Sequence, residues 1–325
     1  MDIQYLLWLQ ELRESSAGVL DQFFIALTNF NVGKGTIVLI ALIYWSVNKN
    51  AGVYLLFSYN LGYVINQFIK NTFCIYRPWI RSSKIHPVKA VLEGASGYSF
   101  PSGHTMTAVT IYGGLGWWYR KRKWLMIPCF ILALLFAFAR NYLGVHTPQD
   151  VVVGALVGVL ALWMTHHLCE WFLKHPKRDW LIMLCAVGFA AVLFIFARYK
   201  SYPLDYVSGQ LLVDPENMMT DCFSAAAALI GSAIGWFIEF RFIKFSMDVS
   251  KKLKLLRFLV GTALLLMINK TLIHYLQSLV TEQWKTAVQL FMVTILIQVV
   301  YPFLFTMFER HVLTRIKKYR NTTEK

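Results

Sequence analysis

Long apolar runs follow one another along the whole chain, and they constrain its fold more than any other feature. A helix needs about 20 predominantly apolar residues to cross a bilayer. About nine runs come close to this length, although several are short and the first is the weakest. The runs cover residues 34–48, 51–71, 104–119, 124–140, 148–172, 180–198, 222–241, 255–278 and 285–308. The pattern predicts an all-α fold, a polytopic transmembrane helical bundle.

The composition agrees with a membrane protein. Of the 325 residues, 57% are hydrophobic and only 15% are charged, whereas about a quarter are charged in a soluble domain. The net charge of +15 would suggest nucleic-acid binding in a soluble protein. Here the basic residues stand mainly in short clusters between apolar runs, so we expect no nucleic-acid partner. The five cysteines form no CxxC pair, so neither a disulfide framework nor a metal site is expected.

The N-terminal segment, residues 1–33, has a mixed pattern. Leucines and phenylalanines recur at helical spacing, with Glu11, Arg13, Glu14 and Asp21 between them. This pattern is typical of an amphipathic helix that lies in the membrane interface. A first helix packed against the bundle is the alternative. The start of the chain lacks a basic segment followed by an apolar core, so no cleavable signal peptide is expected.

Clusters of basic residues predict how the bundle is oriented. They lie at 120–123, 174–178, 241–257 and 310–320. With nine spans all four clusters fall on one side, which is cytoplasmic by the positive-inside rule. The loops at 72–103, 141–147, 199–221 and 279–284 then face the other compartment. We expect a multi-pass protein with its N-terminus outside and its C-terminus inside, and short loops favour a bacterial inner membrane.

Three polar segments gather on the predicted outer side, and they contain most of the residues able to do chemistry. They read KNTFCIYRP at 70–78, YSFPSGH at 98–104 and RNYLGVHTPQD at 140–150. A single basic residue at the end of a span is commonly an anchor that reaches into the interface. Three such segments at one face, each with a cation or a histidine, indicate a binding site instead.

The cations and the small residues of these segments suit a compact polyanion. Lys70 and Arg77 are two helical turns apart and share a face if the helix continues, and Arg140 adds a third cation. Guanidinium groups match phosphate oxygens in bidentate geometry. Ser102 is a candidate N-cap, and Gly103 lets the backbone approach a ligand. The helix that follows would present free N–H groups to an anion.

Two histidines and an aspartate add reactivity. His146 and Asp150 are four residues apart at a predicted helix start, so their side chains can meet. An aspartate that accepts the imidazole N–H leaves the other ring nitrogen free to attack. His104, on a separate segment, could protonate a leaving oxygen. A capping role for Asp150 is the alternative if the pair stood alone.

These residues resemble the three signature motifs of the type 2 phosphatidic acid phosphatase (PAP2) superfamily. The matching patterns are Lys70-x6-Arg77-Pro78, Pro101-Ser102-Gly103-His104 and Arg140-x5-His146-x3-Asp150, within residues 34–172. One departure is Ala139, where the motif usually has serine. The resemblance implies that His146 attacks phosphorus, that Asp150 orients it and that His104 serves as acid and base. It implies that Lys70, Arg77, Ser102, Gly103 and Arg140 hold the phosphate, without metal or cofactor.

The resemblance also divides the chain and suggests a substrate class. A catalytic helical core is expected at 34–200, between the segment 1–33 and C-terminal transmembrane helices with a cytoplasmic tail at 201–325. The expected substrate is a lipid phosphate monoester or diphosphate, of the phosphatidic acid, phosphatidylglycerol phosphate, sphingoid phosphate or undecaprenyl diphosphate class. A lipid phosphotransferase and a non-catalytic anion transporter are the alternatives. The sequence leaves the oligomeric state open.

The C-terminal part contains one unusually polar stretch around Asn269, Lys270 and His274. Helix packing or anchoring at the interface explains such residues in most spans. A contact with the lipid head group, or an entry groove, is the sharper hypothesis. The loop at 79–100 is expected to cover the site.

Overall fold

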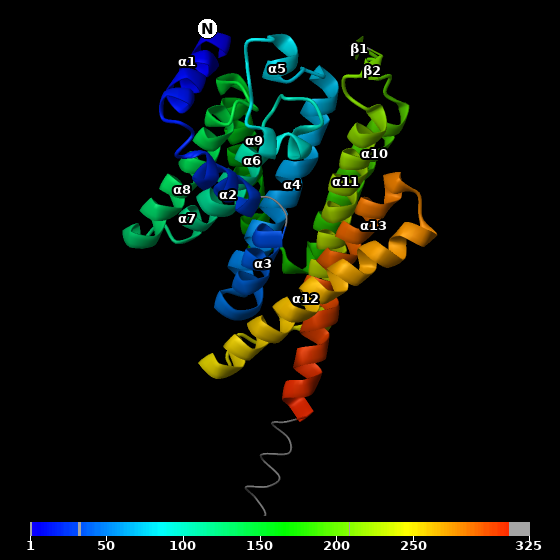
Figure 1. Ribbon diagram of the computed structural model, residues 1–325. Coiled ribbons are helices and arrows are strands. Elements are labelled where there is room, and N and C mark those ends of the chain that lie inside the picture. The colour runs from blue at the N-terminus through cyan, green and yellow to red at the C-terminus, as the bar shows by residue number, and fades with distance from the viewer. Residues whose placement is uncertain (1, 32–33, 208, 312–325) are drawn as a thin grey trace, which may run out of the picture.

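The computed structural model describes residues 2–31, 34–207 and 209–311, and these residues form a bundle of helices (Figure 1). Within this part of the chain the strands are limited to a short antiparallel hairpin, β1 (Tyr206–Val207) with β2 (Gln210–Leu211). The all-α prediction is therefore confirmed for the described residues.

The N-terminal helices are short. They are α1 (Asp2–Ser15), α2 (Asp21–Asn31) and α3 (Lys34–Leu42), and α3 continues into a π-helical turn, η1 (Ile43–Val47). In α1, Leu6 and Leu9 are buried, and Arg13 Nη2 donates to the carbonyl of His86 at 2.6 Å. These contacts support the alternative of a first helix packed against the bundle, and an interfacial position for α1 remains a prediction.

The helices around the motifs form the middle of the chain. They are α4 (Lys49–Phe73), α5 (Pro78–Arg81), α6 (Gly103–Ala108), α7 (Gly114–Trp118), α8 (Lys123–Tyr142), α9 (Pro148–Lys174) and α10 (Asp179–Tyr199). A π-helical stretch, η4 (Val109–Gly113), joins α6 to α7, and the loops hold three 3₁₀ turns, η2 (Lys89–Val91), η3 (Glu93–Ala95) and η5 (Pro176–Arg178). Irregular backbone of this kind is tolerated at membrane depth when its N–H and C=O groups find hydrogen-bond partners within the protein.

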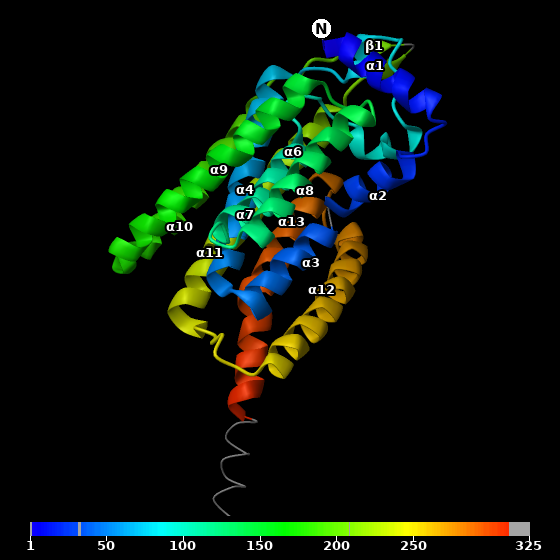
Figure 2. The same cartoon turned by 90° about the vertical axis from the view of Figure 1, so that its left-hand side faces the viewer.

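Three long helical segments follow the hairpin. They are α11 (Pro215–Ile238) with η6 (Glu239–Ile243), α12 (Lys251–Leu279), and α13 (Glu282–Ile295) with η7 (Leu296–Val300). Figure 2 shows α12 on the opposite side of the bundle from α9 and α10. Asn269 accepts a hydrogen bond from Gln289 Nε2 at 2.7 Å, whereas Lys270 and His274 are exposed. The helix-packing interpretation therefore fits Asn269.

Every predicted span lies on a helix, but fewer than nine of the described helices are long and apolar enough to cross a membrane. Six described helices are long and apolar enough to cross a membrane, and a pair bent by 53°, residues 21–30 with 35–47, would make a seventh. The helix α4 and the segment 103–118 do not pass this test. The first is rich in polar residues and the second is short, so the count of nine is not confirmed.

A tight contact between two helices sets the position of the second motif. A Cβ added to Gly154 of α9 would lie 2.5 Å from the carbonyl oxygen of Ser102. Because only glycine fits there, the backbone just before α6 can rest directly on α9. Small residues at helix interfaces allow this kind of close approach in membrane proteins.

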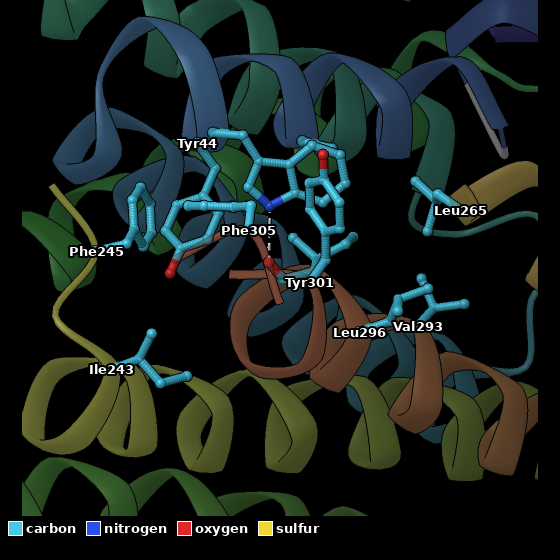
Figure 3. Close-up of a cluster of buried hydrophobic side chains, with 11 residues drawn as sticks. Tyr44, Ile243, Phe245, Leu265, Val293, Leu296, Tyr301 and Phe305 are labelled. Atoms are coloured by element: carbon cyan, nitrogen blue, oxygen red, sulfur yellow. Dashed lines mark hydrogen bonds between the residues drawn. The ribbon is translucent and has the colours of Figure 1, made fainter. Parts of the chain in front are cut away.

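An aromatic cluster joins the N-terminal helices to the C-terminal ones. Figure 3 shows Tyr44 of η1 with Phe245, Tyr301 and Phe305. Trp45, also in this cluster, is fully buried and donates its indole N–H to the carbonyl of Ile297 at 2.8 Å. The C-terminal helices are thereby fixed to the part of the chain that leads into α4.

Candidate active site

The three sequence motifs meet at one end of the bundle, where Figure 1 labels α5 and β1. Lys70 lies in the last turn of α4, Arg77 immediately precedes α5, and His146 lies in the loop before α9. Ser102 is the N-cap of α6, and Arg140 lies near the end of α8. The predicted gathering of these segments is therefore present in the fold.

His146 is held between a carboxylate and a guanidinium. Its Nδ1 lies 3.5 Å from Oδ2 of Asp150, and its Nε2 lies 2.9 Å from Nη1 of Arg77. Because a guanidinium can only donate, Nε2 must be the acceptor, which assigns the proton of a neutral ring to Nδ1. The imidazole therefore has the tautomer in which Nδ1–H faces Asp150 and Nε2 carries the lone pair.

The pKa of His146 supports the same protonation state. The imidazole is almost fully buried. Burial lowers the pKa of His146 well below its usual range, and Arg77 adds to the shift while Asp150 opposes it. The ring is neutral near pH 7, and only a neutral imidazole has a free lone pair for attack.

Asp150 is fixed by several donors. Its Oδ2 accepts from Ser99 Oγ at 2.6 Å and from the backbone N–H of Thr147 at 2.7 Å. The Asp150 N–H in turn donates to Thr147 Oγ1 at 3.3 Å, so the two residues form a capping box at the start of α9. The capping role and the contact with His146 are thus both present and are not alternatives.

Two of the cations are fixed by loop carbonyls. Lys70 Nζ donates to the carbonyls of Tyr98 at 2.8 Å and Pro101 at 3.0 Å. Arg77 donates from Nε to Gly97 and from Nη1 to Val145. These bonds hold the loop before α6 against α4. An ammonium has three N–H donors, so Lys70 keeps one for an anion.

Arg77 remains a cation although it is buried. Burial lowers the pKa of its guanidinium to about 10, and the carboxylates of Asp150 and Asp221 oppose that shift. The charge is therefore present at neutral pH.

Arg140 is a buried cation with spare hydrogen-bonding capacity. The side chain is 1% exposed, and its Nη1 lies 3.5 Å from Thr28 Oγ1. Its Nε has no hydrogen-bond partner. A buried guanidinium N–H without a partner is unfavourable and is explained if a ligand completes it.

His104 belongs to the same group of charges. It is half-buried at the start of α6, and it interacts electrostatically with Arg140, His146 and Arg77. Beside it, Ser102 accepts at Oγ from the Thr105 N–H at 3.4 Å, as the N-cap prediction requires.

Some residues around the site were not singled out from the sequence. Ser99 holds Asp150, and Asn141 Nδ2 donates to the carbonyl of His146 at 2.8 Å. Both residues lie inside or next to the motifs, and this position in the sequence could have pointed to them. Asp221 of α11 acts electrostatically on Lys70 and Arg77. It is distant from the motifs in sequence, and no sequence pattern pointed to it. Ala139 is fully buried in an apolar cluster and offers no hydroxyl.

A metal site is a separate question from the anion site. Over residues 2–31, 34–207 and 209–311, no group of three or more His, Cys, Asp or Glu side chains is arranged to hold a metal ion. The polar groups gathered here are mostly N–H donors, which suit an anion.

Two family models match this chain, and both describe the same superfamily. Residues 51–174 match the model of the PAP2 superfamily, and residues 223–311 match the model described as PAP2 superfamily phosphatase, transmembrane extension. No solved structure matches the chain.

Several curated relatives resemble part of the chain. An undecaprenyl-diphosphatase of Sulfolobus acidocaldarius is 29% identical over 36% of this chain and 54% of its own length. The phosphatidylglycerophosphatase B of Bacillus subtilis is 29% identical over 35% of this chain and 55% of its own. The undecaprenyl-diphosphatase BcrC of Bacillus subtilis is 28% identical over 44% and 71%. The chain thus spans about half the length of the first two relatives.

Proposed function

Because the chain belongs to the PAP2 superfamily and carries the transmembrane extension of that family, we propose that it is a membrane enzyme that hydrolyses a lipid phosphate. The substrate is a phosphate monoester or diphosphate, and the reaction passes through a phosphohistidine on His146. The observation that carries the proposal is the fixed tautomer of His146, whose Nε2 lone pair faces the guanidinium of Arg77.

The first half of the reaction transfers the phosphoryl group to the protein. Oxygens of the bound phosphate replace His146 Nε2 as acceptors of the Arg77 N–H, which frees the lone pair. Nε2 attacks phosphorus while His104, protonated beside the bound phosphate anion, gives a proton to the leaving oxygen. The ring becomes an imidazolium, and Asp150 stabilises it through Nδ1–H.

The second half releases phosphate. His104, now neutral, takes a proton from a water molecule that attacks the phosphohistidine. The bond from phosphorus to Nε2 breaks, and His146 returns to its neutral state. In both steps Lys70, Arg77 and Arg140 stabilise charge on the equatorial oxygens, together with the backbone at Ser102 and Gly103. No metal or cofactor enters this scheme.

The position of the site suits an amphiphilic substrate. The motif residues lie where helices of the bundle end, so a head group can enter while its lipid tail stays at membrane depth. Arg140 lies near one end of α8 and the basic turn at 120–123 at the other, about 30 Å away for 20 residues. The positive-inside rule then supports a site on the non-cytoplasmic side, and the short loops favour a bacterial inner membrane.

The proposal also assigns separate roles to the two regions of the chain. Residues 34–200 form the catalytic core, and residues 201–325 support it. The basic residues Arg315, Lys317, Lys318 and Arg320 lie outside the described residues and enter only as the cytoplasmic tail.

A substrate panel tests the proposal. Purified protein is incubated in EDTA with phosphatidic acid, phosphatidylglycerol phosphate, sphingosine phosphate or undecaprenyl diphosphate, and free phosphate is measured, with His146→Ala as the control. We expect release from at least one lipid by the wild type and none by the variant. If the substrate carries a radiolabelled phosphate, transfer of the label to a second lipid would indicate a phosphotransferase. Anion binding without any reaction, unchanged in His146→Ala, would indicate a transporter.

A further inference from the structure

One buried amide beside the site has no partner in the protein. Asn66 is 1% exposed, and neither its Oδ1 nor its Nδ2 makes a hydrogen bond. The two atoms of such an amide are easily interchanged in assignment, but both lack a partner, so the conclusion is independent of the orientation. A buried amide without partners is unfavourable, and a ligand that completes it is a physical explanation.

The position of Asn66 indicates which ligand. It lies on α4 one helical turn before Lys70. A Cβ added to Gly103 would lie 3.6 Å from Asn66 Oδ1. The amide is therefore next to the residue that joins Ser102 to His104, inside the group of side chains assigned to phosphate.

A second unpaired donor lies in the same group. The Nε of Arg140 has no partner either, and Arg140 interacts electrostatically with His104. Asn66 thus borders the 102–104 segment, and the charge of Arg140 acts on His104 of the same segment. An oxyanion accepts several hydrogen bonds at once and would satisfy both donors.

Another asparagine of α4 shows that the fold can pair an amide on this helix. Asn60 is also 1% exposed, but its Nδ2 donates to Ser232 Oγ at 2.6 Å. Asn60 and Asn66 therefore share helix, residue type and burial, and they differ in whether the protein itself supplies a partner.

We propose that Asn66 is a further phosphate-binding residue, whose Nδ2 donates to a non-bridging oxygen of the phosphate held by Lys70, Arg77 and Arg140. A phosphate oxygen can only accept, so the amide presents its NH₂ to the anion. The inference rests on the proposed function, because it concerns the same site.

Orthovanadate, a compact tetrahedral oxyanion that can become five-coordinate as phosphorus does during the transfer, is the probe. For Asn66→Ala we expect the inhibition constant of orthovanadate to rise about 10- to 100-fold, as for the loss of a hydrogen bond to a charged group. Asn66→Asp should bind still more weakly, because a carboxylate repels the anion. The melting temperature without ligand should stay at the wild-type value in Asn66→Ala, since no hydrogen bond is lost.

Asn60→Ala is the matched control. It breaks the bond to Ser232, so we expect a lower melting temperature with an unchanged orthovanadate constant. Orthovanadate affinity that is unaltered in both Asn66 variants would overturn the inference, whatever happens to stability. A wild-type protein that neither releases phosphate nor binds orthovanadate would overturn the proposed function together with it.

Discussion

The catalytic helices and the C-terminal extension differ most in where their polar side chains lie. The helix α4 buries six of them: Ser58, Asn60, Asn66, Gln67, Lys70 and Asn71. The helix α12 of the extension passes the test for a membrane span and buries the smallest share of its residues among the six candidates. The helix that carries Lys70 fails the same test. The helical segments that carry Lys70 and the second motif therefore look least like membrane spans, whereas α8 and α9, which carry Arg140 and Asp150, pass the test.

Several contacts between the two regions lie away from the motifs. Trp45 bonds to Ile297, Asn60 bonds to Ser232, and Lys49 Nζ lies 2.5 Å from Glu239 Oε1. Closer to the site, α11 packs against the loop whose Gly97 carbonyl accepts a hydrogen bond from Arg77. A Cβ added to Gly97 would collide with the terminal methyl group of Met218 in α11. We therefore expect changes in the core to alter turnover and changes in the extension to alter stability, unless they touch that loop or Asp221, whose charge acts on Lys70 and Arg77.

Arg140→Lys should have the largest effect among the core substitutions that keep the charge. Lysine cannot reproduce the planar donors of a guanidinium, including the unpaired Nε. We expect kcat/KM to fall about 100-fold, measured as phosphate release from the best lipid of the panel. Arg120→Lys, on the basic turn between α7 and α8, is the control and should leave the rate unchanged.

Ser99→Ala tests the support of Asp150. The substitution removes the 2.6 Å bond to Oδ2 and the 3.4 Å contact of Ser99 Oγ with His146 Nδ1, and it leaves the bond from Thr147. We expect kcat to fall about 5- to 10-fold with KM nearly constant, as for one lost hydrogen bond. Ser96→Ala changes an exposed serine of the same loop and should behave as the wild type. Equal rates for both variants would remove Ser99 from the account.

The pH dependence tests the contact between Arg77 and His146. Burial and the nearby charge of Arg77 lower the pKa of His146, so in the wild type the imidazole stays neutral as pH falls from 8 to about 6. Arg77→Met removes the charge and so raises this pKa, although burial still lowers it. The ratio of variant to wild-type kcat/KM should then fall as the pH is lowered from 7.5 to 5.5, because protonation removes the lone pair. Protonation of the substrate affects both enzymes equally and therefore cancels in the ratio. A ratio that does not change with pH would contradict the contact between Arg77 and His146.

Glu239→Gln is the smallest expected change in activity and probes the extension. Glu239 is 1% exposed and pairs with Lys49, which is partly exposed. Breaking the pair should lower the free energy of unfolding by about 3 kcal/mol, with kcat unchanged at 25 °C. The exposed Glu170→Gln should change neither quantity. A large loss of kcat in Glu239→Gln would show that the two regions are less separate than the contacts indicate.

The gathering of the motifs was predictable because each one puts a fixed set of residue types at the end of a helix. His146 and Asp150 were expected to be close, since they are four residues apart at a helix start. Ser99 had no such constraint, because its contact with Asp150 depends on how the loop folds over α9. The number of spans was hard to predict for a related reason. Hydropathy counts polar residues such as Asn60 and Asn66 against a span, although both are buried inside the bundle.

Attack by His146 is the central claim, and trapping the covalent intermediate tests it most directly. The enzyme is mixed with a ³²P-labelled lipid phosphate, quenched in alkali within one turnover, digested and mapped. The account predicts label on the peptide that contains His146, stable in alkali and lost in acid, and absent from His146→Ala. Label on another residue, or turnover by the wild type with no labelled peptide at any quench time, would contradict it.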